Sequence, residues 1–384
     1  MSAVTTARLR RPWTWLLVLA MLALVPAGPS SAATAARCTG WRIVPSPTPG
    51  GSANVPSVVA FRSTAWAVGF SVPAMGGGAT VALHRVGGHW ISVPPRNPDP
   101  TSNRLDAVDG LSDHDVWAVG SRENGDHGTL VEHWNGTAWS VVPSPSPPNT
   151  FNSLDGVSVV SPTDAWAVGY AQSMSGFSVT SLIEHWNGHD WQIVPSPNPG
   201  DENYLLDVFA RSATDVWAVG QTTQPSKVAN LVVHWNGTSW RRVAVPSPGF
   251  EYNALESVLA LGPKNVWAVG NASNKGTSRR QPLTFHWNGT GWKQVPNPRL
   301  YGQLNDVSSP SVGHLWAVGY REGSADSLIE RWNGSSWRIA RSANLQGASG
   351  SPLFGVAATP TQTWAVGAAI VGSDLHTVIE RPCA

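Results

Sequence analysis

The sequence DVWAVG at positions 215–220 is followed fourteen residues later by HWNGTSW at positions 234–240. In the second segment, Asn-Gly stands between residues typical of strands, and this dipeptide favours the tight type I′ turn of a β-hairpin. A further apolar segment ending in a turn signal precedes DVWAVG. Together these segments predict a unit of four short antiparallel strands.

The same unit recurs along the whole chain, because WAVG occurs seven times, at Trp66, Trp117, Trp166, Trp217, Trp267, Trp316 and Trp364. A period of about 50 residues indicates copies of one supersecondary unit. In the third copy we predict strands at 154–160, 164–169, 182–186 and 191–194. Four-stranded units arranged radially form a β-propeller. We therefore predict an all-β, seven-bladed propeller with blades at approximately 53–96, 103–145, 152–197, 203–247, 253–297, 302–341, and 350–382 completed by 39–45.

The two ends of the predicted propeller complement each other. The last repeat lacks a fourth strand, and the segment at 39–45 matches one, so an N-terminal strand would close the ring. In that register Cys38 and Cys383 meet where the other repeats have their Asn-Gly turn. We predict a disulfide formed in an oxidising compartment, worth roughly 5 kcal/mol in the chain-entropy account. A metal pair or a catalytic thiol is the alternative, but no histidine cluster accompanies the cysteines.

The N-terminus has the pattern of a secretory leader. Arg8, Arg10 and Arg11 precede an apolar run at 13–25, and Ala33–Ala35 offers a cleavage site. We therefore expect residues 1–36 to be a signal peptide and residues 37–384 to be a secreted, extracellular protein. Loss of the leader removes three arginines and no acidic residue, which changes the formal charge from +1 to −2. A chain so close to neutrality gives no electrostatic reason to bind nucleic acid or to insert into a membrane.

Two repeated motifs also carry a family resemblance. DVWAVG at 115–120 and 215–220, with HWNGTSW at 234–240, resembles the repeats of secreted bacterial β-propeller proteins, loosely grouped with kelch, sialidase-type and WD40-like propellers. This resemblance implies a propeller fold over the mature chain and leaves the activity open, because such repeats occur in proteins with many functions. The WNGxxW hairpin also looks like that of fucose-binding propeller lectins, whose strand motif is not matched here.

Most aromatic and charged residues repeat in register, which favours structural roles. All tryptophans outside the leader fall on three repeated positions, so we expect packing between blades, with sugar stacking as the alternative. A basic residue recurs six positions before the last tryptophan of each repeat, at His84, His133, His185, His234, His286 and Arg331. We expect a repeated structural pairing, with pH sensing as the alternative. The aspartates at 115, 164 and 215 are interpreted as turn caps, with calcium binding as the alternative.

Residues that do not repeat are the better candidates for function. All five tyrosines fall beside the variable loops that open on one face, together with four asparagines at the start of the predicted inner strand. The candidate ligand-binding residues are Tyr170, Tyr204, Tyr252, Tyr301, Tyr320, Asn103, Asn152, Asn203 and Asn253. Aromatic residues gathered on one loop face suit a recognition surface. The asparagines could instead cap the strands through Asx turns.

The sequence thus predicts a secreted, non-catalytic module that binds an extracellular or cell-surface glycan or protein through one loop face. We expect a monomer that needs no metal and no cofactor. The alternative is an extracellular glycan-active hydrolase or lyase, although no GxSxG, HExxH or P-loop motif is present. Its catalytic residues would come from Asp201, Glu202, Glu251, Arg279, Arg280 and Arg321.

Overall fold

The computed structural model describes residues 38–72, 77–123, 127–176, 178–274, 277 and 279–383. The predicted leader therefore lies outside the described residues. From Cys38 onward the chain belongs to one compact unit of 28 strands, and the described part contains no helix. No helix long and apolar enough to cross a membrane is therefore found among these residues. The predicted all-β architecture is confirmed.

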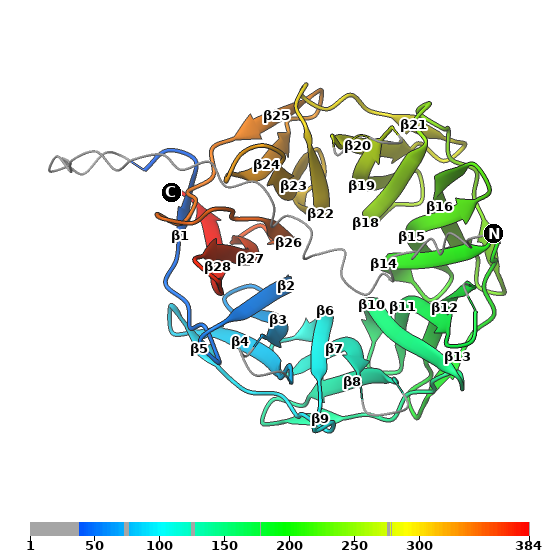
Figure 1. Ribbon diagram of the computed structural model, residues 1–384, viewed down its shortest axis with the longest axis horizontal. Helices are drawn as coiled ribbons and strands as arrows, with labels where there is room; N and C mark the ends of the chain where they lie inside the picture. Colours follow the sequence, from blue (N-terminus) through cyan, green and yellow to red (C-terminus); the bar gives the residue numbers. More distant parts are fainter. Residues whose placement is uncertain are drawn as a thin grey trace, which may run out of the picture. The chain divides into compact units, whose positions relative to one another are not determined.

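The strands form repeated four-stranded antiparallel sheets arranged around a common centre (Figure 1). Twenty-eight strands fit seven such sheets. Three sheets, β10–β13, β14–β17 and β18–β21, are also joined by single parallel bridges, Val179 to Glu202 and Val228 to Tyr252. The strands nearest the centre are β2 (Ala53–Ala60), β6 (Asn103–Ser112), β10 (Thr150–Ser161), β14 (Glu202–Ser212), β18 (Tyr252–Gly262), β22 (Gly302–Ser311) and β26 (Leu353–Ala358).

The WAVG motif occupies the second strand of every sheet. These strands are β3 (Ala65–Ser71), β7 (Asp115–Arg122), β11 (Asp164–Ser173), β15 (Asp215–Gln224), β19 (Asn265–Ser273), β23 (His314–Arg321) and β27 (Thr363–Val371). The third strands are β4 (Thr80–Val86), β8 (Thr129–Trp134), β12 (Val179–Trp186), β16 (Lys227–Trp235), β20 (Gln281–Trp287), β24 (Ser327–Trp332) and β28 (Asp374–Pro382). The outer strands are β5 (His89–Ser92), β9 (Trp139–Val141), β13 (Trp191–Ile193), β17 (Trp240–Arg242), β21 (Trp292–Gln294), β25 (Trp337–Ala340) and β1 (Trp41–Ile43).

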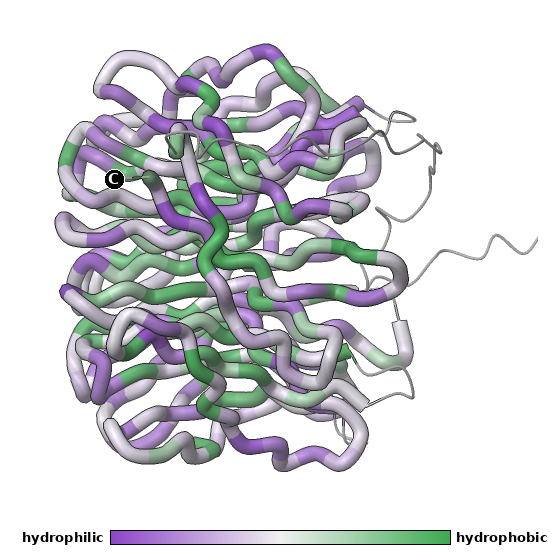
Figure 2. The backbone as a smooth tube through the Cα atoms, turned by 90° about the vertical axis from the view of Figure 1, so that its left-hand side faces the viewer, coloured by the Kyte–Doolittle hydropathy of each residue, from purple (hydrophilic) through white to green (hydrophobic). Residues whose placement is uncertain are grey.

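Antiparallel order gives every sheet two different ends. The turn end carries the short turn between the first two strands and the Asn-Gly hairpin between the last two. The loop end carries the connection between the second and third strands and the connection to the next sheet. Figure 2 shows hydrophobic segments running along the strands, interleaved with hydrophilic ones.

The N-terminal strand β1 supplies the outer strand of the β26–β28 sheet. Trp41 lies opposite Pro382, Arg42 opposite Arg381 and Ile43 opposite Glu380. Cys38 and Cys383 form a disulfide with their Cα atoms 5.7 Å apart, and the Cys383 N–H donates to the Gly40 carbonyl at 2.8 Å. The N-terminal strand predicted to complete the last sheet and the predicted disulfide are both present.

Reduction of this disulfide should destabilise the folded protein without changing its strand content. The bond joins residues 345 positions apart, and a loop of that length stabilises by roughly 5 kcal/mol in the chain-entropy account. We expect Cys383→Ser to lower the midpoint of thermal unfolding and to leave the far-ultraviolet circular dichroism spectrum unaltered. Two titratable thiols in the oxidised protein would contradict the assignment.

The core lies between neighbouring sheets and is built from tryptophans. Trp217 of β15 contacts two tryptophans of the next sheet, Trp287 at 5.4 Å and Trp292 at 5.6 Å between ring centroids. Trp217 is 3 % exposed. The same contact with the outer-strand tryptophan recurs around the centre in the pairs Trp66–Trp139, Trp90–Trp364, Trp117–Trp191, Trp166–Trp240, Trp267–Trp337 and Trp41–Trp316. The repeated tryptophans therefore pack sheet against sheet, as predicted.

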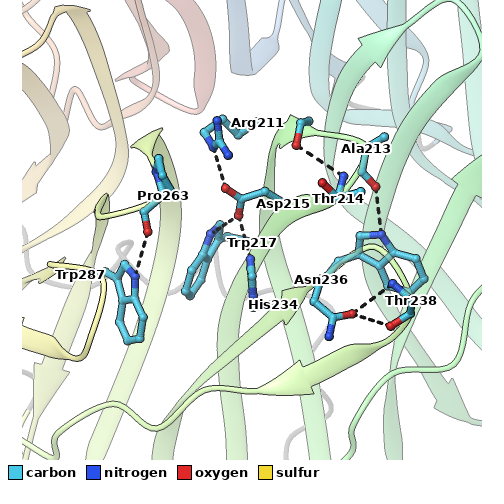
Figure 3. Close-up of polar contacts among 12 residues, drawn as sticks. Arg211, Ala213, Thr214, Asp215, Trp217, His234, Asn236, Thr238, Pro263 and Trp287 are labelled. Carbon is cyan, nitrogen blue, oxygen red and sulfur yellow. Dashed lines mark hydrogen bonds and ion pairs between the residues drawn. The ribbon is translucent and has the colours of Figure 1, made fainter.

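The repeated histidine pairs with the residue that begins the WAVG strand. His234 Nε2 lies 2.7 Å from Asp215 Oδ1, which also accepts the indole N–H of Trp217 at 2.9 Å (Figure 3). The His234 ring lies 4.2 Å from the Trp217 ring. His133 and His185 pair with Asp115 and Asp164 in the same way. These aspartates thus accept hydrogen bonds from side chains of their own sheet, a role that the turn-cap interpretation did not include.

Side chains of the inner strands also join neighbouring sheets. The Val258 N–H donates to Asp207 at 2.9 Å, and the Val356 N–H donates to Asp306 at 2.7 Å. Ser57, Asp109 and Ser158 accept the equivalent bonds from the sheets that follow them. Desolvation raises the pKa of Asp207 to about 7 and that of Asp306 to about 6. We assign this set of side chains to assembly of the sheets.

A buried glutamate recurs on the third strand, and its partner differs among the sheets. Glu132 accepts the Arg96 N–H at 2.8 Å, and Glu380 accepts the Ala343 N–H at 3.1 Å. Glu184 is 0 % exposed, and neither of its carboxyl oxygens has a hydrogen-bond partner among the described residues. Pro145 stands in the preceding connection where the repeat has Arg96 or Ala343, and proline has no N–H to donate.

Replacement of Glu184 by glutamine should stabilise the protein above neutral pH. Burial raises the pKa of Glu184 from 4.5 to about 8, so the folded state binds this proton more tightly than the unfolded state. The free energy of unfolding contributed by Glu184 therefore falls as the pH rises from about 4.5 to about 8. At pH 9 we expect Glu184→Gln to unfold with a free energy higher by more than about 1 kcal/mol, and the gain should vanish near pH 4.

The matched control is Glu380→Gln, because Glu380 accepts hydrogen bonds from both Ser342 and Ala343. Its stability gain at pH 9 should be smaller or absent. An equal gain in the two variants, measured by urea unfolding across pH, would show that Glu184 is not the unpaired member of the set.

Candidate functional site

The inner strands depart from regular pairing at one repeated position. The register between the first two strands shifts just after a buried leucine, at Leu105, Leu154, Leu205, Leu255, Leu304 and Leu353. Each shift leaves one extra residue on the inner strand, which is the form of a β-bulge. The extra residues are Asp106, Asp155, Leu206, Glu256, Asn305 and Phe354. Bulges often re-aim a side chain beside a functional site, and here three of the six extra residues are acidic.

Around these bulges lies a group of polar and aromatic side chains, the inner polar cluster. It comes from the inner strands β6, β10, β14 and β18, the WAVG strands β11, β15 and β23, and the connections β19–β20 and β23–β24. Its members are Arg104, Asp106, Asp155, Tyr170, Tyr204, Gln221, Tyr252, Glu256, Arg280, Tyr320 and Glu322. All of them stand on the loop-end side of their strands.

The first half of the cluster is built around Arg104. Its guanidinium forms an ion pair with Asp106, with the Arg104 Nε donating to Asp106 Oδ1 at 3.0 Å. Asp155 accepts the Ser153 hydroxyl at 2.6 Å. The rings of Tyr170 and Tyr204 lie 5.1 Å apart in an edge-to-face arrangement. A single cation thus stands beside two carboxyl groups and an aromatic pair.

Negative charge is in excess in this half of the cluster. Desolvation raises the pKa of Asp155, and the neighbouring carboxylates of Asp106 and Glu256 raise it further, against the opposing effect of Arg104. Desolvation also raises the pKa of the Tyr170 hydroxyl, with a further contribution from Asp155. A cation brought to these carboxyl groups would relieve the repulsion among them.

The second half is a hydrogen-bonded network around Arg280. The Arg280 Nη1 donates to Tyr320 Oη at 3.2 Å and to Glu322 Oε1 at 3.3 Å. The Tyr252 hydroxyl donates to Gln221 Oε1 at 2.8 Å. Desolvation raises the pKa of Tyr320 to about 12 in spite of the nearby Arg280. Glu256 links the halves, because its charge acts on both Asp155 and Tyr320.

The structure brings together four of the five predicted tyrosines. Tyr170, Tyr204, Tyr252 and Tyr320 belong to the inner polar cluster. The Tyr301 carbonyl accepts the N–H of Glu322, but its ring is 42 % exposed and has the Arg279 guanidinium 5.0 Å above it. Of the six residues that the sequence suggested for a catalytic site, Arg280 belongs to the inner polar cluster. Of the others, Glu202 accepts the Thr223 hydroxyl.

The four asparagines are buried and hydrogen-bonded to the backbone. Asn203 is 1 % exposed and donates to the carbonyls of Val179 and Gly200. Asn253 donates to Val228 and Phe250 in the same way. Asn103 donates to the Asp99 carbonyl, and Asn152 to those of His127, Pro147 and Thr150. These amides hold the connection between sheets against the inner strand.

Sequence reasoning missed the cluster members Arg104, Asp106, Asp155, Gln221, Glu256 and Glu322. A signal exists for four of them, because Arg104, Asp106, Asp155 and Glu256 lie in the segment after the asparagine where the repeats agree on leucine and differ on either side of it. A period of two places Arg104 and Asp106 on the face opposite Leu105. It does not reveal the register shift that follows each leucine.

No protein family and no curated protein matches this sequence. Solved structures are similar in fold. YCF48 bound to D1 peptide has a TM-score of 0.58 and 15 % identity, and the match covers 92 % of this chain and 100 % of that one. The fold is β-propeller-like. YCF48 from Cyanidioschyzon merolae is also similar in fold, with a TM-score of 0.53 and 16 % identity over 89 % of this chain and 98 % of that one. A protein of unknown function from Dyadobacter fermentans has a TM-score of 0.53 and 11 % identity over 89 % of this chain and 99 % of that one.

Among the residues that the structure describes, no group of three or more histidine, cysteine, aspartate or glutamate side chains has the arrangement of a metal site. The repeated histidines are instead distributed one to a sheet, each beside its own tryptophan. What the described part of the propeller offers at its centre is a set of hydrogen-bonding, aromatic and charged side chains.

Proposed function

We propose that the protein is a secreted, non-catalytic binding module that recognises an extracellular protein or glycan through the loop end of its central strands. In this proposal the 28 strands form seven blades in a closed ring, and the inner polar cluster is the binding site. The supporting observation is that polar, aromatic and charged residues converge there from five consecutive sheets, although the packing positions elsewhere repeat.

Contacts across the ends of the chain support the closed ring. Trp316 packs against Trp41 of β1 at 5.1 Å, and Trp364 packs against Trp90 of β5 at 5.4 Å. These are the contacts that other neighbouring sheets make with each other. β2 also lies beside β26 and β27. A ring closed in this way would hold the bulged residues at fixed positions around the centre.

The charge of the cluster favours a ligand that carries a cationic group. In the first half of the cluster the carboxyl groups of Asp106 and Asp155 share a single arginine, Arg104, and the charge of Glu256 also acts on Asp155. A lysine or arginine side chain of an extracellular protein would neutralise the excess charge, and its aliphatic part would lie against Tyr170 and Tyr204. A propeller of similar fold has been solved with a bound peptide, which supports a polypeptide ligand over a neutral glycan at this site.

Loss of one tyrosine or one carboxylate should weaken this binding without unfolding the protein. We expect Tyr252→Ala and Asp155→Asn each to lower the affinity for a lysine-rich extracellular peptide at least about tenfold, because central aromatic and charged anchors dominate interfaces. Binding should also weaken as the pH falls through the raised pKa of Asp155, since the protonated carboxyl no longer attracts a cation. Isothermal titration calorimetry with a peptide library would measure both effects.

Thr238→Ala is the matched control, because Thr238 lies in the Asn-Gly hairpin at the turn end and bonds to Asn236 (Figure 3). Its affinity should equal that of the wild type. If the hairpin variant lost affinity while Tyr252→Ala and Asp155→Asn retained it, the binding site would lie at the turn end.

One observation favours the alternative of a glycan-active enzyme. Asp155, whose pKa is raised by desolvation, stands beside the carboxylate of Asp106, and a carboxyl group with a raised pKa can act as a general acid. The variant Asp155→Asn distinguishes an enzyme from a binding module. In an enzyme, Asp155→Asn would abolish turnover of a polysaccharide while the polysaccharide still bound.

A further inference from the structure

The turn between β22 and β23 differs from its counterparts at the turn end. Gly313 has a φ of 87°, whereas the equivalent residues His114, Thr163, Thr214 and Lys264 are outside the positive-φ region. A positive φ at the third turn residue is characteristic of a type II turn. Relative to a type I turn, its central peptide is rotated by about half a turn, since ψ of the second residue moves from about −30° to about +120°. The Val312 carbonyl is therefore turned away from the direction taken in the other sheets.

This rotation removes a hydrogen bond that the other sheets make. The Trp287 indole N–H donates to the Pro263 carbonyl at 3.3 Å (Figure 3), and the Trp235 indole N–H donates to Ala213 at 3.1 Å. Trp134 and Trp186 donate to the turn carbonyls of Asp113 and Pro162. Trp332 occupies the same position in β24, and its Nε1 makes no such bond to the residues that the structure describes. Among the five tryptophans that precede an Asn-Gly turn in the described sheets, Trp332 alone lacks the bond to a turn carbonyl.

A cavity of about 410 Å³ lies at the same junction, between the β18–β21 and β22–β25 sheets. Trp267 and Trp332 line it, with their ring centroids 5.0 Å apart. Leu315 and Val312 add apolar walls, and Val312 is 74 % exposed. In the β10–β13 and β14–β17 sheets the threonines equivalent to Gly313 lie against the glycine of the Asn-Gly turn, whereas Gly334 has no such side chain beside it. The glycine therefore opens the cavity as well as rotating the peptide.

The lining of this cavity carries no formal charge at neutral pH. Asn265 stands where Asp115, Asp164 and Asp215 stand in the other sheets, and it accepts from His286 Nε2 and from the Trp267 indole. Desolvation lowers the pKa of His286, so its imidazole is neutral at pH 7. Indole rings, an amide and a neutral imidazole combine apolar surface with hydrogen-bonding groups. Such a lining suits a neutral ligand with one apolar face and several hydroxyl groups.

We propose that this junction is a binding site for a neutral pyranose unit of a glycan. The sugar ring would stack on the accessible part of the half-buried Trp332 indole, and one ring hydroxyl would accept the Trp332 Nε1–H. The pocket lies at the turn end and shares no residue with the inner polar cluster, so it does not depend on the function proposed there.

The test is a tryptophan-fluorescence and saturation-transfer NMR titration with the neutral methyl glycosides of glucose, galactose and mannose. At least one should bind the wild type, and the charged glucuronoside should bind more weakly. Trp332→Phe keeps an aromatic face and removes the donor, so it should weaken the affinity by about three- to tenfold. Trp235→Phe is the matched control, because that indole N–H is already bonded to Ala213, and its affinity should equal that of the wild type.

A second variant tests the turn itself. Gly313→Thr disfavours a positive φ and should return the turn to the type I form that Thr214 adopts, which covers the hairpin and restores the acceptor for Trp332. Binding should be lost while the melting temperature is maintained or raised. The proposal is overturned if none of the neutral glycosides binds the wild type at millimolar concentration, if an aromatic probe such as indole binds in their place, or if Trp332→Phe and Gly313→Thr both bind with wild-type affinity.

Discussion

The insertion of one tryptophan from each sheet against the tryptophans of the next is the interaction on which the rest of this structure depends. An isolated four-stranded sheet of this size cannot bury both of its faces. Six of the seven WAVG rings are buried because a neighbouring sheet covers them, and Trp316 is half-buried. The histidine that stacks on the same ring, held by Asp215 or its equivalents, fixes the position of the indole. Sheet pairing therefore determines where the inner strands, and everything they carry, are placed.

The repeat accounts for how much could be predicted from sequence. The spacing of WAVG and the Asn-Gly hairpins was sufficient for the four-stranded units, for β1 as the missing outer strand, and for the bond between Cys38 and Cys383. The histidine partner was only partly predicted, because Asp215 follows turn chemistry in sequence and meets His234 only when two strands pair. The bulges at Asp106, Asp155 and Glu256 could not be predicted, because a bulge is a shift in the pairing of two strands and leaves no mark in the composition or in the length of the repeat.

The proposed sites lie where the repeat fails, and each failure has a local physical cause. At the loop end, a bulge after the repeated leucine of the inner strand adds a residue whose type varies from sheet to sheet. Three of these added residues are acidic. At the turn end, Gly313 changes one turn type and thereby leaves the Trp332 indole N–H without its acceptor. At positions that keep the repeat, such as the buried Asn203 and Asn253, the side-chain amide N–H groups donate to backbone carbonyls.

The central claim is that the buried WAVG tryptophans hold the sheets together, and equilibrium unfolding of Trp217→Ala tests it most directly. Trp217 is 3 % exposed and its indole N–H is bonded to Asp215. Truncation of a buried ring of this kind costs about 3 to 5 kcal/mol, and the account predicts a loss of that size in the free energy of unfolding. Unchanged stability together with lost ligand binding would contradict it.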